Sequence, residues 1–175
     1  MQVLERVKDT AFLGREFLAW LWFKTETDDE PFDLGDGVKA ELWFEGRMTL
    51  QAETERDIET VTCTGDWPNM KQARFALSEK KDISQAMVRL VIGDNHWSFS
   101  LDSTWMNFRS FKTPKVVQDK NDDLEGIFFE KAFLTEEAIA AIEAIFAAFI
   151  KIRISPQWEE TESPALLKWI NDRSV

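Results

Sequence analysis

The sequence has a single cysteine, Cys63, a single histidine, His96, and no tyrosine among its 175 residues. One cysteine excludes an intramolecular disulfide framework. One cysteine and one histidine do not supply any of the usual zinc-ligand sets, so we expect no metal site of that kind. Cys63 alternates with Val61 on an expected strand and is interpreted as a packed thiol. No serine or cysteine motif surrounds His96, so we expect a structural or surface histidine, although distant residues can converge in a fold.

Long hydrophobic runs and glycine-rich phosphate loops are also missing. The longest apolar candidate, residues 138–150, contains Glu143 and falls short of the ~18 residues that a membrane-spanning helix needs. The first residues do not resemble a signal peptide, because charged residues continue through Lys8 and Asp9. No glycine-rich loop of the kind that cradles a phosphate occurs. We therefore expect a cytoplasmic protein without a membrane partner, and we identify no catalytic residue and no cofactor site.

Negative charge dominates the composition, with 32 Asp and Glu residues against 21 Lys and Arg, and a formal net charge of −11. Such a surface repels phosphate at long range, so nucleic-acid binding requires a local basic patch. Residues 25–36 contain several acidic residues and no basic one. Acidic loops usually serve only solvation, but spaced carboxylates can also imitate DNA phosphates. An acidic protein-interaction module, or a DNA-mimic inhibitor of a DNA-processing or defence enzyme, therefore stays open as an alternative function.

The most apolar stretch, residues 12–23, indicates where a core or an interface forms. A helix from about residue 11 to residue 25 fits this stretch, because Leu13, Phe17, Trp20 and Leu21 recur at helical spacing. Further aromatic residues beside this stripe make the helix apolar on most faces. We therefore expect the helix to be buried on most faces.

Alternation with period two, together with turn residues, predicts most of the remaining elements. Glu45-Gly46 is interpreted as a hairpin turn, and Thr135 as the cap of a long helix that ends near Arg153. The expected strands are 38–45, 47–53, 57–64, 85–92, 96–101, 105–112 and 127–133, and the other expected helices are 69–78, 135–153 and 164–172.

This order of elements predicts one α+β domain, residues 1–175. In it, antiparallel β-meanders of about six or seven strands pack with an N-terminal helix, a middle helix and a long C-terminal helix. Two sub-halves, residues 1–80 and 81–175, would each hold one meander followed by a helix.

The first candidate for nucleic-acid contact is segment 104–118, which has no acidic residue and contains Arg109, Lys112 and Lys115. Cations neutralise phosphates, and the interleaved aromatic rings could stack on exposed bases. On a regular strand, however, Arg109 would share one face with Phe111, and Lys112 would lie on the other. The alternative is a half-buried strand with a solvated outer face.

The second candidate is segment 71–81, which holds four basic residues against one acidic residue. These residues extend the first patch if the fold brings the two segments together. Otherwise they form a solvated helix face and loop. The four residues are Lys71, Arg74, Lys80 and Lys81.

Residues 119–130 match a calcium-binding loop only in part. Asp119, Asn121, Asp123 and Glu130 occupy its first, third, fifth and twelfth positions, but Leu124 replaces the glycine that the sharp turn requires. We therefore do not expect calcium binding. A metal-dependent nuclease would need carboxylates that converge in space, and the sequence shows no motif for one.

The opening segment, residues 13–22 with the sequence LGREFLAWLW, resembles the start of short proteins similar to the recombination-associated RdgC family. Residues 86–92, 97–101 and 108–112 resemble the two-strand unit of that family and its following basic strand. Residues 153–158 resemble the end of the same short homologues. The resemblance touches most of the chain in patches, and its first motif is the most specific.

The resemblance implies a non-catalytic protein of recombination or replication that binds duplex DNA without base preference. Long members of the family form ring-shaped dimers that encircle DNA and restrain recombinase loading, so the resemblance also implies a homodimer. Duplex DNA, or a DNA-processing protein, is the expected partner. The family supplies no catalytic residue to carry over to this chain.

Overall fold

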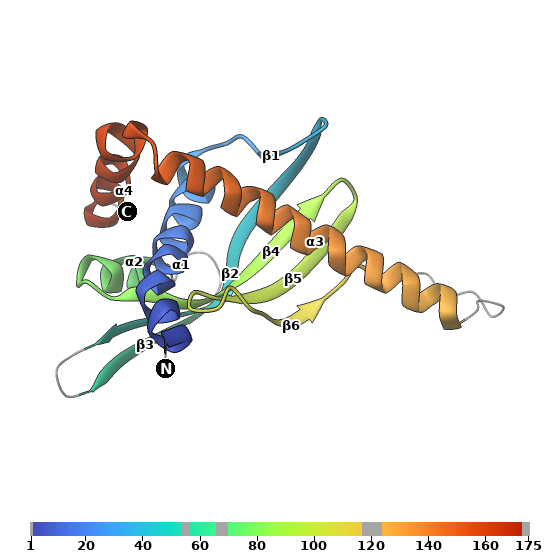
Figure 1. Ribbon diagram of the computed structural model, residues 1–175, viewed down its shortest axis with the longest axis horizontal. Helices are drawn as coiled ribbons and strands as arrows, with labels where there is room; N and C mark the ends of the chain where they lie inside the picture. Colours follow the sequence, from blue (N-terminus) through green and yellow to red (C-terminus); the bar gives the residue numbers. More distant parts are fainter. Residues whose placement is uncertain (1, 54–56, 66–69, 117–123, 173–175) are drawn as a thin grey trace.

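The computed structural model describes residues 2–53, 57–65, 70–116 and 124–172. In these parts the chain folds as four α-helices and one six-stranded antiparallel sheet (Figure 1), which confirms the α+β prediction. The helices are α1 (Gln2–Thr27), α2 (Met70–Ser78), α3 (Leu124–Arg153) and α4 (Ser163–Asn171), with a π-helical turn, η2 (Trp158–Glu162), before α4. The strands are β1 (Phe32–Gly35), β2 (Val38–Glu53), β3 (Ile58–Gly65), β4 (Asp82–Ile92), β5 (Asn95–Asp102) and β6 (Phe108–Lys112).

The sheet joins the parts of the chain that precede and follow α2. Strands β4, β5 and β6 pair antiparallel in sequence order, as expected for the second meander. The first expected meander, strands 38–45, 47–53 and 57–64, is not observed, because residues 38–53 form one strand that pairs with both β1 and β3. Strand β2 also pairs with β4, so all six strands belong to one sheet. β1 and β3 pair with opposite ends of β2 on the same side, and β6 forms the other edge of the sheet.

One face of the sheet carries the core, and α1 and α3 cross in front of this face (Figure 1). Alternate side chains of the strands are buried here, among them Leu50 and Phe99. The most apolar stretch of the sequence contributes to this core, because six of the seven residues 17–23 are buried. Phe17 of α1 packs on Phe149 of α3, with ring centroids 5.5 Å apart. The prediction of a helix buried on most of its faces is therefore confirmed.

Helix α1 also packs tightly against the connection between β5 and β6. Gly14 is buried, and a Cβ atom placed on it would lie 1.9 Å from the carbonyl oxygen of Ser103. Ser103 is buried in turn, and its backbone N–H donates to the carbonyl oxygen of Ser84 at 2.9 Å. Only glycine fits this close approach, which fixes the loop that leads into β6.

Strand β2 does not turn at Glu45-Gly46, so the hairpin predicted there is wrong. The strand continues through a bulge, in which Glu45, Gly46 and Arg47 lie opposite a single residue of β4. Gly46 has a φ of 73°, a conformation that glycine adopts without steric cost. Because the bulge adds two residues, the apolar side chains before and after it stay on the same face, and one long strand can form.

The hairpin turn lies instead at Asp36-Gly37, inside the segment expected to be an acidic loop. Both residues have positive φ, 51° and 78°, as in the two-residue hairpin loops that an Asp-Gly pair favours. The backbone N–H of Gly35 also donates to the Asp33 carboxylate at 2.9 Å. The sequence therefore contained a signal for this turn. It contained no comparable signal for the short strand β1.

Helix α3 begins at Leu124 rather than at Thr135, and it ends at Arg153 as predicted. The strand expected at 127–133 is therefore wrong, because a short apolar run does not distinguish a strand from a helix. Thr135 is not a cap, since its hydroxyl donates to the Lys131 carbonyl at 2.8 Å within the helix. Among the described residues, no helix is both long enough and apolar enough to cross a membrane.

Candidate nucleic-acid interface

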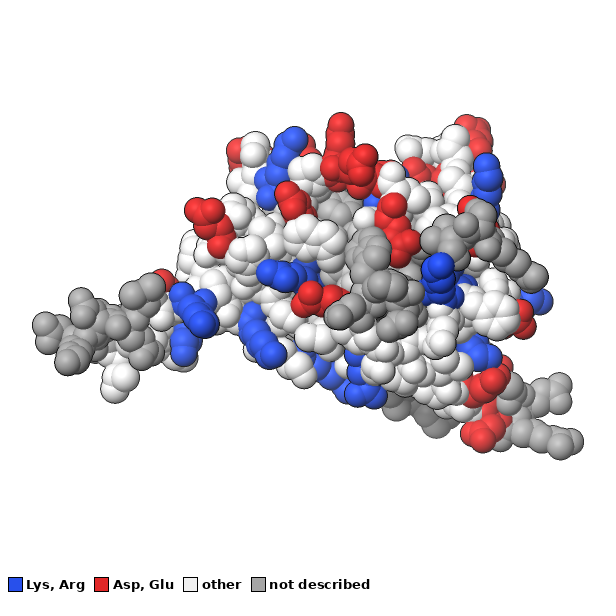
Figure 2. Space-filling view, turned by 180° about the vertical axis from the view of Figure 1, so that it is seen from behind, with Lys and Arg blue, Asp and Glu red and all other residues white. Residues whose placement is uncertain are grey.

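Among the described residues, no helix covers the face of the sheet opposite α1 and α3, which we call the uncovered face. Its side chains alternate with the core residues along each strand, and none of those described on this face is buried. Figure 2 shows Lys and Arg side chains spread through the middle and lower part of the molecule seen from this side. Most Asp and Glu side chains lie along the upper border of the same view. Basic and acidic side chains are therefore partly separated on this side of the molecule.

Strand β6 places Arg109 and Lys112 together on the uncovered face. They pair with residues of β5 that are two positions apart, although they are three positions apart on β6. The extra residue forms a bulge at Ser110, which has a φ of 52°. The expectation that Arg109 shares a face with Phe111 is therefore wrong, because the bulge reverses the alternation after Arg109.

The phenylalanines of β6 lie on the opposite, helix-covered face. Phe108 and Phe111 both pack against the buried Phe99, with ring centroids 5.0 Å and 5.3 Å apart. This aromatic packing anchors the edge strand to the core. It leaves the two cations of β6 free to face away from the helices.

Replacing Ser110 by glycine is expected to stabilise the fold by about 0.5 kcal/mol, because a residue with a Cβ atom is strained at positive φ. Replacing Ser110 by valine is expected to destabilise it by about 1–2 kcal/mol. Urea denaturation midpoints of the two variants and the wild-type chain measure both effects. Equal midpoints for all three proteins would contradict the assigned bulge.

A first row of basic residues crosses the uncovered face at Ser98 of β5. Arg89 of β4 and Lys112 of β6 are the register partners of Ser98 on its two sides. Neighbouring strands are ~4.8 Å apart, so the two cations have backbones roughly 10 Å apart. The hydroxyl oxygen of Ser98 is covered by its neighbours and has no hydrogen-bond partner in the described structure.

A second row lies two residues further along the strands, about 7 Å away. Here Met87 of β4 and Arg109 of β6 are the register partners of Ser100. Arg47 lies in the β2 bulge, opposite Met87. We name the four cations of these two rows the basic belt: Arg47, Arg89, Arg109 and Lys112.

The basic belt has the arrangement needed to contact a run of phosphates. All four side chains are exposed, and they span the sheet from β2 to β6. Cations at such spacings neutralise backbone charge and release counterions. Contacts of this kind fix a nucleic acid on the protein but do not read its base sequence.

Two carboxylates lie next to the belt. Arg109 Nη2 is 3.8 Å from Asp102 Oδ2, and Arg89 Nη1 is 4.0 Å from Glu45 Oε2. Both pairs are long and both guanidinium groups are exposed, so each pair contributes about 0–1 kcal/mol and either guanidinium can exchange its carboxylate for a phosphate. Asp102 has a further role, because its Oδ1 accepts the backbone N–H groups of Thr104 and Trp105, both at 3.0 Å. These bonds order the turn before β6.

The second basic segment does not extend the belt. Strand β3, against which α2 packs, lies at the edge of the sheet opposite β6, and β2, β4 and β5 separate the two. Lys71 and Lys80 are exposed near α2. Lys81 is paired with Glu59 of β3 at 2.8 Å, and only 12% of its side chain is exposed.

Arg74 is part of the core rather than of a binding surface. Its side chain is buried, its Nη2 donates to the carbonyl oxygen of Asp172 at 3.2 Å, and its guanidinium lies 5.4 Å from the ring centroid of Trp169. Burial raises the pKa of the nearby Glu26 carboxyl, while a hydrogen bond from Trp22 (2.7 Å) and the charge of Arg74 act against this rise. Arg74 therefore connects α2 to α4 and to the residue that follows it.

Lys115 is exposed and follows the end of β6, next to the belt in sequence but outside the paired strand. Sequence reasoning missed Arg47 and Arg89 as candidates. The alternation of β4 put Arg89 on its more polar face, which was a usable signal. Arg47 had a similar signal, because it immediately precedes Met48 on the expected strand 47–53. Only its register position opposite Met87 depends on the bulge beside Gly46.

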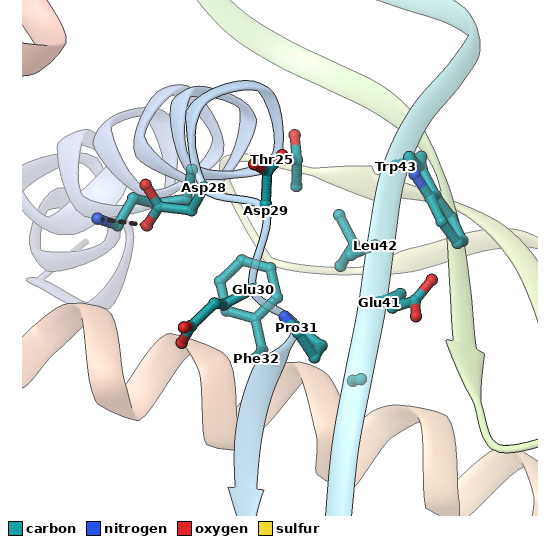
Figure 3. Close-up of a pocket in the computed structure, with 11 residues that line it drawn as sticks. Thr25, Asp28, Asp29, Glu30, Pro31, Phe32, Glu41, Leu42 and Trp43 are labelled. Carbon is teal, nitrogen blue, oxygen red and sulfur yellow. Dashed lines mark ion pairs between the residues drawn. The ribbon is translucent and has the colours of Figure 1, made fainter.

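The acidic segment forms a shallow pocket between the end of α1 and strands β1 and β2, with a volume of about 210 Å³ (Figure 3). Its carboxylates do not converge on one point. Asp28 pairs with Lys24 at 2.9 Å. Glu41 lies on the far side of β2, next to Trp43, whereas Glu30 points toward α3. The pocket is therefore a surface of spread negative charge.

The other described residues considered for catalysis or metal binding lie on different elements of the fold. Cys63 is buried, as predicted for a packed thiol, and burial raises the pKa of its thiol. His96 is exposed on the uncovered face. Asp119, Asn121 and Asp123 lie outside the described residues, and Glu130 belongs to α3. No group of three or more His, Cys, Asp or Glu side chains in the described parts could hold a metal ion.

Comparison of the chain with protein-family models finds no match. Comparison with curated protein sequences also finds none. The class of protein that the fold defines is an α+β domain with one helix-covered and one open sheet face. The likeness to the RdgC family therefore stays a prediction from sequence motifs.

Proposed function

We propose that this chain is a non-catalytic DNA-associated protein of recombination or replication that binds duplex DNA without base preference. Its basic belt contacts the phosphates. The observation that carries the proposal is the register of the sheet, which aligns Arg47, Arg89, Arg109 and Lys112 on one uncovered face. The likeness of residues 13–22 to RdgC-type proteins supports the same function.

The proposal is also compatible with the net negative charge of the protein. Repulsion from a net charge of −11 acts over many ångströms at low salt, whereas the belt acts at contact distance. We therefore expect modest affinity, carried by few contacts, and not the tight binding of strongly basic proteins.

A salt titration tests this function. Four phosphate contacts predict a slope of about −3 to −4 when the logarithm of the binding constant is plotted against the logarithm of salt concentration. Between about 50 and 200 mM salt, the affinity should fall roughly a hundredfold. Fluorescence anisotropy with two duplexes of unrelated sequence measures the slope and the lack of base preference. Absence of binding to either duplex at low salt would refute the proposal.

A second candidate function is an acidic protein-interaction module or DNA mimic. It is favoured by the exposed carboxylates of Asp28, Asp29, Glu30, Asp33 and Asp36, which spread over the α1–β1 connection and the β1–β2 hairpin. This function predicts binding to a lysine-rich peptide and no affinity for DNA. Replacing Asp29, Glu30 and Asp33 by their amides should then abolish peptide binding, and the anisotropy titration should show no DNA complex.

A further inference from the structure

An open pocket with a volume of about 570 Å³ lies on the uncovered face, over the strands β2, β4 and β5. The register of the sheet brings its residues together, because Val91 is the register partner of Glu41 and of His96, and Arg89 is the partner of Trp43. We name this site the Trp43 pocket. Among the side chains that line it are Glu41, Trp43, Glu45, Arg89, Val91 and His96.

The centre of the Trp43 pocket is apolar. Trp43 and Val91 are both half-buried, so the faces that they still expose contribute apolar surface to it. Glu41 and Glu45 lie two positions before and two positions after Trp43 on β2, on the same face of the sheet. Figure 3 shows Glu41 and Trp43 on the same side of β2. The pocket therefore has an indole ring between two carboxylates.

The charged side chains of the pocket carry a negative excess. Glu41 forms no ion pair within the described part of the chain. Glu45 pairs with Arg89 at 4.0 Å, a long and exposed contact. Two carboxylates against one guanidinium attract a cation and disfavour an anion.

We propose that the Trp43 pocket binds a linear aliphatic diamine, with one ammonium group at Glu41, the other at Glu45, and the methylene chain on Trp43. This inference does not depend on DNA binding. The methylene groups bury apolar surface against the indole ring, and each ammonium group forms charge-assisted hydrogen bonds with a carboxylate. An ammonium group near the ring face gains further from the cation–π interaction.

The spacing of the two carboxylates sets the length of the ligand. Side chains stand roughly perpendicular to a sheet, so the carboxylates of residues four positions apart lie roughly 13 Å from each other. With a contact of about 2.8 Å at each end, the two nitrogen atoms of a bridging ligand are roughly 7–8 Å apart. An extended diamine with five methylene groups, cadaverine, has about this length.

A primary diamine fits the pocket better than a quaternary ammonium compound does. Quaternary ammonium groups are recognised by cages of several aromatic rings. Among the described residues that line this pocket, only Trp43 presents a ring at the surface, because Phe44 is buried. Primary ammonium groups also donate hydrogen bonds to the two carboxylates, which a quaternary group cannot do.

A chemical-shift titration of the isotope-labelled wild-type chain with cadaverine tests the pocket. The titration is run at low salt, in a buffer without amines and without DNA. The backbone amide signals of Glu41, Trp43 and Glu45 and the indole N–H signal of Trp43 are expected to shift together and to saturate as for one site. Absence of these shifts at millimolar cadaverine would overturn the proposal, even if a lysine-rich peptide bound to the same residues.

A double variant separates the pocket from general attraction to an acidic protein. Glu41→Gln, Glu45→Gln should weaken cadaverine binding about tenfold, because both ionic contacts are lost while the side-chain size is kept. The matched control is Glu136→Gln, Glu143→Gln, which changes two exposed residues of α3. Both variants change the net charge from −11 to −9. The control should keep its affinity within about twofold, and equal losses in the two variants would overturn the proposal.

Two other amines test the bridging arrangement. Pentylamine keeps the apolar chain but has one ammonium group, and propanediamine keeps both ammonium groups on a shorter chain. Each is expected to bind roughly tenfold more weakly than cadaverine, because it reaches one carboxylate at a time. Equal affinities for the three amines would overturn the proposal. DNA is absent from every titration, so these results and the anisotropy measurements decide the two proposals separately.

Discussion

A variant with Arg109→Glu and Lys112→Glu is expected to bind duplex DNA on the order of a hundredfold more weakly than the wild-type chain at low salt. Two of the four belt cations then repel phosphates that they would otherwise neutralise. The slope of the salt dependence should also fall, from about −4 to about −2, because two phosphate contacts are lost. Fluorescence anisotropy titrations measure both quantities.

The matched control for this variant is Lys71→Glu, Lys80→Glu. Both variants change the net charge from −11 to −15, and both replace exposed lysines or arginines. Lys71 and Lys80 lie near α2, at the far edge of the sheet from β6. We expect the control to lose less than about threefold in affinity, since only long-range repulsion increases. Equal losses in the two variants would mean that the overall field, and not the belt, governs binding.

Replacing Gly14 by alanine is expected to destabilise the fold by about 3 kcal/mol, which corresponds to a melting temperature roughly 10 °C lower. The new Cβ atom would lie 1.9 Å from the Ser103 carbonyl oxygen and 2.8 Å from its carbon. A side-chain rotation cannot relieve a clash between two backbones, so α1 and the β5–β6 connection must move apart. Thermal unfolding followed by circular dichroism gives the change.

The control for this prediction is Gly126→Ala in α3. Nothing lies within 4 Å of a Cβ atom placed on Gly126, so only the helix propensity changes. Alanine is then expected to stabilise the fold by about 0.5 kcal/mol. The same substitution therefore has opposite signs in two helices. A stabilising effect at Gly14 would show that α1 does not approach Ser103 as closely as described.

The sequence predicted helices and strands correctly where the local spacing of apolar residues matches the burial observed in the fold. The stripe of Phe17, Trp20 and Leu21 predicted a buried helix, and the alternation of residues 85–92 predicted β4. The errors occur where one pattern fits two structures. The apolar run at 127–133 is compatible with a strand or a helix, and the deciding context, a helix that projects from the sheet, is not local.

The candidate site was harder to predict than the fold, because two bulges create it. Regular alternation separates Arg109 from Lys112, and only the extra residue at Ser110 brings them to one face. The bulge at Gly46 leaves the face of Arg47 unchanged but sets its register position opposite Met87. A bulge depends on pairing with a neighbouring strand, so a single sequence does not locate it. Arg74 was a candidate that proved to be buried, because it packs on Trp169 of α4, which is remote in the sequence.

Gly14 belongs to the most specific sequence motif, residues 13–22, and it also affects the position of the basic belt. A glycine inside a helical pattern costs about 1 kcal/mol relative to alanine, which indicates a packing reason for it. The structure supplies that reason, because the close contact with Ser103 fixes the turn in which Asp102 binds Thr104 and Trp105. The turn leads directly into Arg109. The opening motif thereby helps to position the belt without contacting a ligand itself.

The most direct test of the belt as a DNA-binding surface is to map the contact by NMR on the isotope-labelled wild-type chain. Adding a short duplex at low salt should shift the backbone amide signals of Arg47, Arg89, Ser98, Arg109 and Lys112. Signals of α2, α4 and residues 28–36 should stay unchanged. Shifts confined to residues 28–36, or no shifts at a duplex concentration well above that of the protein, would contradict the proposed DNA contact.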